Sequence, residues 1–218
     1  AFAAHNELGR LFDEIHYADH MGEGLSKLGH HVEREYRIAL SHEDFTKSYY
    51  VDLLINNSVP YELKTVEELN AEHEAQTLNY LDLSNLHHGK LINFRKPSVE
   101  SWFVSTSLRH EERLKFTVEE SNWSETSQRS TEDTLKALLH EWGTCLSLEA
   151  YKEALIHFCC SGCLSDELLP FRTKSGYQGA VKLNRIDKGS FLYFTTASTY
   201  LKNHEKHLHK VLYLFALI

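Results

Sequence analysis

Three charged residues lie close together in the segment YYVDLLINNSVPYELKTV, residues 49–66. Asp52, Glu62 and Lys64 form the pattern D-x9-E-x-K. Two neighbouring carboxylates repel each other unless a cation lies between them, and carboxylates with water are ligands that suit Mg²⁺. A lysine beside such a cation can position water and stabilise charge on a phosphate. The pattern therefore favours a divalent metal site, with ordinary salt bridges at the end of a sheet as the alternative.

A β-hairpin is predicted to position these residues. Residues 49–55 are rich in β-branched and aromatic side chains, the pair Asn56-Asn57 favours a turn, and residues 59–66 resume an extended pattern. Side chains alternate between the two faces of a strand, so Glu62 and Lys64 are expected to be neighbours on one face.

A helix is predicted after the hairpin, over residues 72–83. Its apolar residues recur at spacings of three, and Asn70 is a suitable N-cap. Gln76 and Tyr80 stand at positions i and i+4, so they are expected to share one face of this helix.

In these residues the sequence resembles the PD-(D/E)xK nuclease superfamily. Asp52 stands as the first acid, Glu62-Leu63-Lys64 as the second motif, and QTLNY at 76–80 as the QxxxY helix of RecB-type members. More narrowly, the chain is similar to the GxxExxY protein family through LGRLFDEIHY, YYVDLLI, YELKTVEELNAEHEAQTLNYL and GKLINF, over roughly residues 8 to 108. Two positions depart from these patterns, because Leu11 replaces the glycine of the family name and Val51 replaces the proline of the superfamily name.

The resemblance implies a metal centre that cleaves phosphodiester bonds. Asp52, Glu62 and the backbone carbonyl of Leu63 would hold Mg²⁺ or Mn²⁺, and Lys64 would orient the attacking water. Glu14, on the first helix, would assist a metal ion or a water molecule. For Glu14 a solvated helix glutamate is the alternative.

Substrate contacts are expected from three further residues. By resemblance, Gln76 would position the substrate or the motif strand, and Tyr80 lies on the same helix face. Lys47 stands just before the motif strand, where it could touch a phosphate, although a surface lysine is the commoner explanation.

The remaining N-terminal elements complete an αβββαβ order, which the resemblance also implies. Residues 5–28 are predicted to form an amphipathic helix, broken near Gly22 and Gly24. Its expected apolar stripe consists of Leu8, Leu11, Phe12, Ile15 and Ala18. A strand over 30–40 should place Val32, Arg34, Tyr36 and Ile38 on one face, and a loop over 41–48 should follow. Strands are predicted at 89–94 and 101–108.

The second half of the chain is predicted to be an α+β extension, so the expected domains are 1–108 and 109–218. Residues 109–130 should be a connector with a possible strand at 114–118. A helix capped by Thr131 or Ser130 should end near Gly143, and a second helix is expected over 148–160. Strands are expected at 167–173, 179–186 and 190–196, and a final helix over 200–217. The pair Cys160 and Cys163 could be half a zinc site, but reduced thiols are the preferred interpretation.

Charge and composition limit the expected partners. Residues 1–108 hold 9 Lys and Arg against 17 Asp and Glu, whereas residues 109–218 hold 14 of each, so the net charge of −8 lies in the first half. Proteins that bind nucleic acid usually carry a basic surface. Affinity for nucleic acid, with DNA preferred as the substrate, should therefore be modest and salt-sensitive, or a protein partner should assist.

The cellular location follows from two absences in the sequence. No run of about 18 apolar residues that could span a membrane and no charged-then-apolar segment typical of secretion is recognisable. We therefore expect a cytoplasmic protein without membrane contact.

Two functions follow from the sequence, and a third possibility is that the phosphodiester belongs to a small nucleotide or to RNA. The leading hypothesis is a metal-dependent nuclease of α/β (mixed α+β) class with a restriction-endonuclease-like core. The alternative is a non-catalytic binding or scaffold module that retains the nuclease fold, since fold alone does not determine activity.

Overall fold

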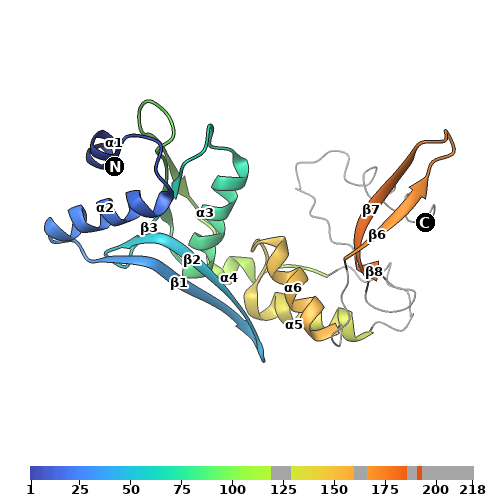
Figure 1. Ribbon diagram of the computed structural model, residues 1–218. Coiled ribbons are helices and arrows are strands. Elements are labelled where there is room, and N and C mark those ends of the chain that lie inside the picture. The colour runs from blue at the N-terminus through green and yellow to red at the C-terminus, as the bar shows by residue number, and fades with distance from the viewer. Residues whose placement is uncertain (119–128, 160–165, 186–190, 193–218) are drawn as a thin grey trace. The chain divides into compact units, whose positions relative to one another are not determined.

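The computed structural model describes residues 1–118, 129–159, 166–185 and 191–192 (Figure 1). The chain divides into two compact units. The first consists of Ala1–Trp123 and Ala137–Ser147, and the second of Ser124–Lys136 and Leu148–Ile218. All of the segment 1–108 lies in the first unit.

A five-stranded sheet forms the centre of the first unit. Its strands follow the order β1-β2-β3-β4-β5, and they are β1 (Val32–His42), β2 (Phe45–Ile55), β3 (Val59–Lys64), β4 (His88–Asn93) and β5 (Glu100–Ser105). Only β3 and β4 are parallel among the neighbouring pairs of this sheet. Since β3 and β4 are parallel, a crossover must join them, and α3 (Ala71–Ser84) supplies it.

Helices cover both faces of the sheet (Figure 1). On one face, Tyr17 and Met21 of α2 (Glu14–Lys27) pack with Leu63 and other buried residues of the sheet, beside α1 (Phe2–Leu8). On the other face, Leu81 of α3 packs with Leu91 and its neighbours. The result is the mixed α/β fold and the αβββαβ order predicted from the sequence, with α1 added.

The predicted hairpin of β2 and β3 is confirmed. Asn56 and Asn57 both have positive φ, 50° and 52°, and the Ser58 N–H donates to the Ile55 carbonyl at 3.0 Å. This is the backbone pattern that two-residue hairpin turns prefer, and asparagine tolerates positive φ better than most residues. The predicted Asn70 cap is also present, because its side chain accepts hydrogen bonds from the backbone of Glu72 and of His73.

The position of the break in the first helix was predicted wrongly. The chain leaves helical geometry at Gly9, whose φ is +76°, while Gly22 and Gly24 lie inside α2. A Cβ on Gly22 would lie 3.3 Å from Cδ of Arg34, so this glycine permits close packing of α2 on the sheet. A glycine inside a helix therefore marked a tight contact here and did not mark an end.

The predicted apolar stripe of this helix was also largely wrong. Leu11 is 73% exposed, and Phe12 and Ile15 are exposed as well. The buried face consists of Tyr17, Ala18, Met21 and Gly22. Tyr17 is completely buried, stacks on Phe94 with a centroid separation of 4.2 Å, and donates its hydroxyl to the Gly9 carbonyl at 2.9 Å.

The predicted loop over 41–48 is instead an extension of the β1–β2 hairpin, with a turn at Glu43-Asp44. Phe45 is buried near Trp142, at 6.1 Å between ring centroids. The Trp142 indole donates to the Ser41 carbonyl at 2.8 Å from 101 residues away. That distant partner explains why the polar sequence of the segment was misread as a loop.

The residues predicted to share one face of β1 contact different helices, α2 and α3. Arg34 lies beside Gly22 of α2, whereas Tyr36 and Ile38 pack with Tyr80 of α3. Strict alternation would place Arg34 and Tyr36 on the same face. Between them stands Glu35, whose φ of 47° rotates the strand.

The later elements agree in part with prediction. They are α4 (His110–Arg113), α5 (Arg129–Trp142), α6 (Leu148–Cys159), β6 (Asp166–Arg172), β7 (Gln178–Arg185) and β8 (Phe191–Leu192), and the three strands form an antiparallel sheet. The possible strand at 114–118 is absent. Cys160, Cys163, most of the predicted strand 190–196 and the predicted final helix lie outside the described residues.

Candidate active site

The two acids of the D-x9-E-x-K pattern meet across adjacent strands. Leu53 of β2 pairs with Tyr61 of β3, so the next residues along the ladder are Asp52 and Glu62. Oδ2 of Asp52 accepts a hydrogen bond from the Leu63 N–H at 2.7 Å. The hairpin register therefore holds Asp52 against the Glu-x-Lys motif, as the sequence predicted.

Glu62 and Lys64 form a buried ion pair. Nζ of Lys64 lies 2.6 Å from Oε1 of Glu62, and both side chains project from the same face of β3. Glu62 is only 3% exposed. Within the described part of the chain, its second oxygen, Oε2, is buried and has no hydrogen-bond partner. A buried carboxylate oxygen without a donor is unfavourable, and a cation would satisfy it.

Glu14 reaches the end of β3 from the first residue of α2. Its Oε1 accepts a hydrogen bond from the Thr65 N–H at 2.9 Å and is 3.4 Å from the Thr65 hydroxyl. This hydrogen bond holds the Glu14 carboxylate one residue beyond Lys64, and the side chain is partly exposed. This position places a third acid beside the motif.

Burial perturbs the ionisation of the two central acids. The pKa of Glu62 is raised to about 7, chiefly by desolvation and next by the charge of Asp52, against the opposing effect of Lys64. Desolvation also raises the pKa of Asp52, although the Leu63 N–H and Lys64 oppose the change. Carboxylates that are costly to ionise without a counter-charge are typical of functional sites.

Glu35 is a neighbouring acid that sequence reasoning missed. It lies opposite Asp52 in the β1–β2 ladder, because the flanking pairs are Arg34 with Leu53 and Tyr36 with Val51. Its charge contributes to the raised pKa of Asp52. Strand periodicity placed Glu35 on a polar face, and nothing local in the sequence indicated its left-handed backbone.

The predicted helical pair Gln76 and Tyr80 lies beside these acids. Nε2 of Gln76 donates to the Tyr80 hydroxyl at 2.7 Å, which confirms their shared face. Burial raises the pKa of Tyr80 to about 12, and the charges of Glu62 and Asp52 act in the same direction. The hydroxyl therefore stays protonated and lies within the electrostatic reach of the acids.

Lys47 lies on β2 rather than in a loop. Its ammonium group is 5.5 Å from the centroid of the Tyr49 ring, and that ring is 6.3 Å from the ring of Tyr80. Lys47 is thus linked to α3 through the contacts of Tyr49 with Lys47 and with Tyr80.

Asp52 and Glu62 offer a small set of carboxylate ligands for a hard divalent cation. No group of three or more His, Cys, Asp and Glu side chains arranged to hold a metal ion occurs in the described ranges. Asp52 and Glu62 nevertheless supply two carboxylates, one with an unsatisfied buried oxygen. Mg²⁺ usually takes one or two carboxylates and keeps several waters, so this donor set is sufficient for it.

Comparison with known families agrees with this geometry. Residues 1–103 match the family model of the PD-(D/E)XK nuclease superfamily. The matched segment includes α1 to β4 and most of β5, and therefore contains Glu14, Asp52, Glu62, Lys64 and Gln76. The comparisons with curated proteins and with solved structures found no match. The narrower GxxExxY and QxxxY assignments stay predictions.

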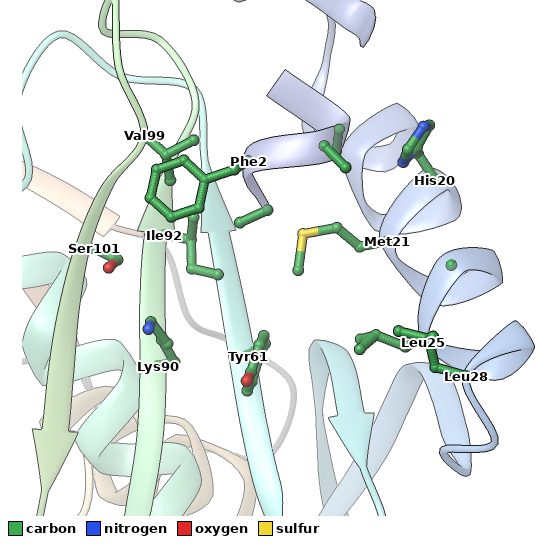
Figure 2. A pocket seen from close by; sticks show the side chains of 14 residues that line it. Phe2, His20, Met21, Leu25, Leu28, Tyr61, Lys90, Ile92, Val99 and Ser101 are labelled. Atoms are coloured by element: carbon green, nitrogen blue, oxygen red, sulfur yellow. The ribbon is translucent and has the colours of Figure 1, made fainter. Parts of the chain in front are cut away.

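An apolar pocket lies on the face of the sheet that α2 covers (Figure 2). It has a volume of about 370 Å³ and lies between α1, α2 and the sheet, with Met21, Leu25 and Ile92 in its lining. Tyr61, which precedes Glu62 on β3, points into this pocket, so Glu62 points away from it. The pocket is thus separate from the candidate active site.

Proposed function

We propose that the chain is a metal-dependent nuclease that hydrolyses phosphodiester bonds in nucleic acid, with DNA as the preferred substrate. The observation that carries the proposal is the adjacent pair of acids, Asp52 and the buried Glu62, with Lys64 beside them and an unsatisfied oxygen on Glu62. The match of residues 1–103 to the nuclease superfamily supports the same reading.

Each residue has a proposed role. Asp52, Glu62 and the Leu63 carbonyl would hold Mg²⁺ or Mn²⁺, with Glu14 as an additional acid. When bound, the ion would supply a Lewis acid that offsets charge on the phosphate. Lys64 would orient the attacking water.

Gln76 would act on the substrate side. Its side-chain amide is fixed by the Tyr80 hydroxyl, so it is held in a defined position beside the acids. Tyr80 and Lys47 would contribute further substrate contacts.

The acidic character of the first half limits how the substrate binds. Residues 1–108 carry 17 acids against 9 Lys and Arg, so phosphate contacts should be few and affinity modest and salt-sensitive. A protein partner could supply the missing basic surface. No helix within the described ranges is long and apolar enough to cross a membrane. A cytoplasmic location is part of this proposal.

The test is cleavage of labelled single- and double-stranded DNA and RNA with Mg²⁺ or Mn²⁺ at low salt. Glu62→Gln and Lys64→Met should each lower the rate by about 10²- to 10⁴-fold. Glu74→Gln and Lys27→Met are the matched controls, because both residues are exposed on helices. The controls should cleave like the parent.

Metal binding provides a second readout. Calorimetry should show Mn²⁺ binding to the parent and weaker binding to Glu62→Gln. A parent chain that cleaves none of the substrates and binds no Mn²⁺ would overturn the proposal and favour the alternative, a non-catalytic module that retains the nuclease fold.

A further inference from the structure

A second pocket borders the Gln76 helix inside the first unit. It has a volume of about 650 Å³ and lies between α3, Tyr49 of β2 and the segment 145–147. Gln76, Asn79 and Tyr80 line it from α3. This volume lies within the range of pockets that bind small molecules, so the space can accept a group as large as a nucleobase.

Hydrogen bonds fix the wall opposite α3. The Ser147 N–H donates to Oδ1 of Asn79 at 2.8 Å, and the Ser147 hydroxyl lies 3.2 Å from the Tyr49 hydroxyl. Asn79 is itself buried. The pocket is therefore built by defined contacts between segments far apart in sequence, and a ligand would meet a preformed surface.

The lining excludes a phosphate group as the occupant. Among the described residues that line it there is no Lys or Arg, but there are the carboxylates of Glu72 and Asp82. The Asp82 carboxylate accepts a hydrogen bond from Thr106 and lies near the charge of Arg113, but its Oδ1 is buried and has no hydrogen-bond partner in the described part of the chain. A carboxylate attracts N–H donors and repels phosphate, so the pocket favours a neutral group that bears an amino substituent.

Aromatic rings and apolar side chains favour a planar occupant. The rings of Tyr49 and Tyr80 lie 6.3 Å apart at an interplanar angle of 70°, and Leu78, Leu108 and Leu146 complete the apolar part of the lining. Nucleobases of any sequence stack on such rings. The amino groups at the edges of some bases can donate hydrogen bonds to carboxylates.

The pocket adjoins the candidate active site through shared residues. Gln76 and Tyr80 line the pocket, and the charges of Glu62 and Asp52 act on Tyr80. A nucleotide whose base enters the pocket would therefore place its sugar and phosphates toward the acids.

We propose that this pocket receives one unpaired nucleobase of the nucleic acid that is cut. The substrate class is then a strand with at least one unpaired nucleotide next to the scissile phosphate, since a base held in a duplex cannot enter. The inference rests on the proposed nuclease function and names its substrate.

The first test measures binding separately from cleavage. The Lys64→Met chain is used because it should leave the oligonucleotide uncut. It is titrated with a single-stranded oligonucleotide that contains 2-aminopurine, and the fluorescence of that base reports its stacking. Ala75→Trp in that background fills the pocket from an exposed position of α3 and should weaken binding by about 5- to 150-fold. Ala71→Trp, at an exposed position of the same helix outside the lining, should change binding less than twofold.

A second variant tests the edge of the base. Asp82→Asn should weaken binding of strands rich in cytosine or adenine more than binding of thymine-rich strands. Equal affinity of the Ala75→Trp and Ala71→Trp chains, together with an unchanged base preference in Asp82→Asn, would overturn the inference.

Cleavage distinguishes this inference from the proposed function. If the parent cuts single strands and fully paired duplex equally and the Ala75→Trp chain retains that activity, the nuclease stands and the base pocket fails. If the parent cuts nothing while Ala75→Trp alone weakens binding of the 2-aminopurine strand, the base pocket stands and the nuclease fails.

Discussion

The replacement Glu62→Gln should make folding less sensitive to pH. The pKa of Glu62 rises from 4.5 to about 7 on folding, chiefly because the side chain is buried. Between these two values the folded chain binds more protons than the unfolded chain, so stability falls as pH rises. This contribution is fully present below pH 4.5 and is lost as the pH passes through about 7.

The magnitude follows from the pKa change. One pH unit of pKa corresponds to about 1.4 kcal/mol, so the full effect is about 3 kcal/mol, of which about 2 to 3 kcal/mol falls between pH 5 and pH 8. Glutamine cannot ionise, so the variant lacks this loss.

The assay is urea unfolding at pH 5 and pH 8 with EDTA, followed by tryptophan fluorescence, because Trp102 and Trp142 both lie in the first unit. The stability lost between the two pH values should be about 2 to 3 kcal/mol smaller in Glu62→Gln than in the parent. Glu74→Gln, an exposed glutamate on α3, should behave like the parent.

The same experiment with Mn²⁺ links stability to the proposed metal site. The ion should stabilise the parent at pH 8 and stabilise Glu62→Gln much less, since a ligand that binds only the folded state adds to its stability. If the stability of the parent and of Glu62→Gln depends on pH in the same way, burial does not raise the pKa of Glu62, and the reasoning is refuted.

Two further predictions concern the scaffold of the first unit. Gly143→Ala should destabilise it by more than about 2 kcal/mol, because Gly143 has a φ of +79° and a Cβ would lie 2.8 Å from Cβ of Arg113. Gly24→Ala, with open space and helical backbone, should stabilise it by about 0.5 to 1 kcal/mol, and urea unfolding of both variants gives the comparison. Tyr17→Phe should cost about 1 kcal/mol by removing the hydrogen bond to Gly9, and Tyr17→Ala about 3 to 5 kcal/mol by also opening the core. Equal losses for the two Tyr17 variants would contradict this division.

The sequence by itself determined the local elements of the candidate site. Strand alternation and the Asn56-Asn57 turn predicted the hairpin that brings Asp52 to the Glu62 motif, because both signals lie within a few residues of the structure they specify. Helical spacing predicted the Gln76 and Tyr80 pair for the same reason.

Tertiary structure decided what depends on distant partners. The misread segment 41–48 is a hairpin that Trp142 packs against, and Gly22 lies inside α2 where Arg34 of the sheet approaches it closely. The exposed Leu11 and Ile15 had the spacing of a core stripe, but α2 turns another face to the sheet. The periodicity of apolar residues predicts that a helix has an apolar face, but it does not show which other element, if any, covers that face.

The electrostatic character of the site and the second pocket also required the fold. Glu35 meets Asp52 only through the β1–β2 register, and Ser147 meets Asn79 only when the segment 145–147 returns to α3. The pKa of Glu62 rises because the surrounding layers remove water from it. Residue types and spacing therefore fixed the chemical groups of the site, whereas burial, register and long-range packing fixed their environment, since desolvation depends on every layer that surrounds a side chain.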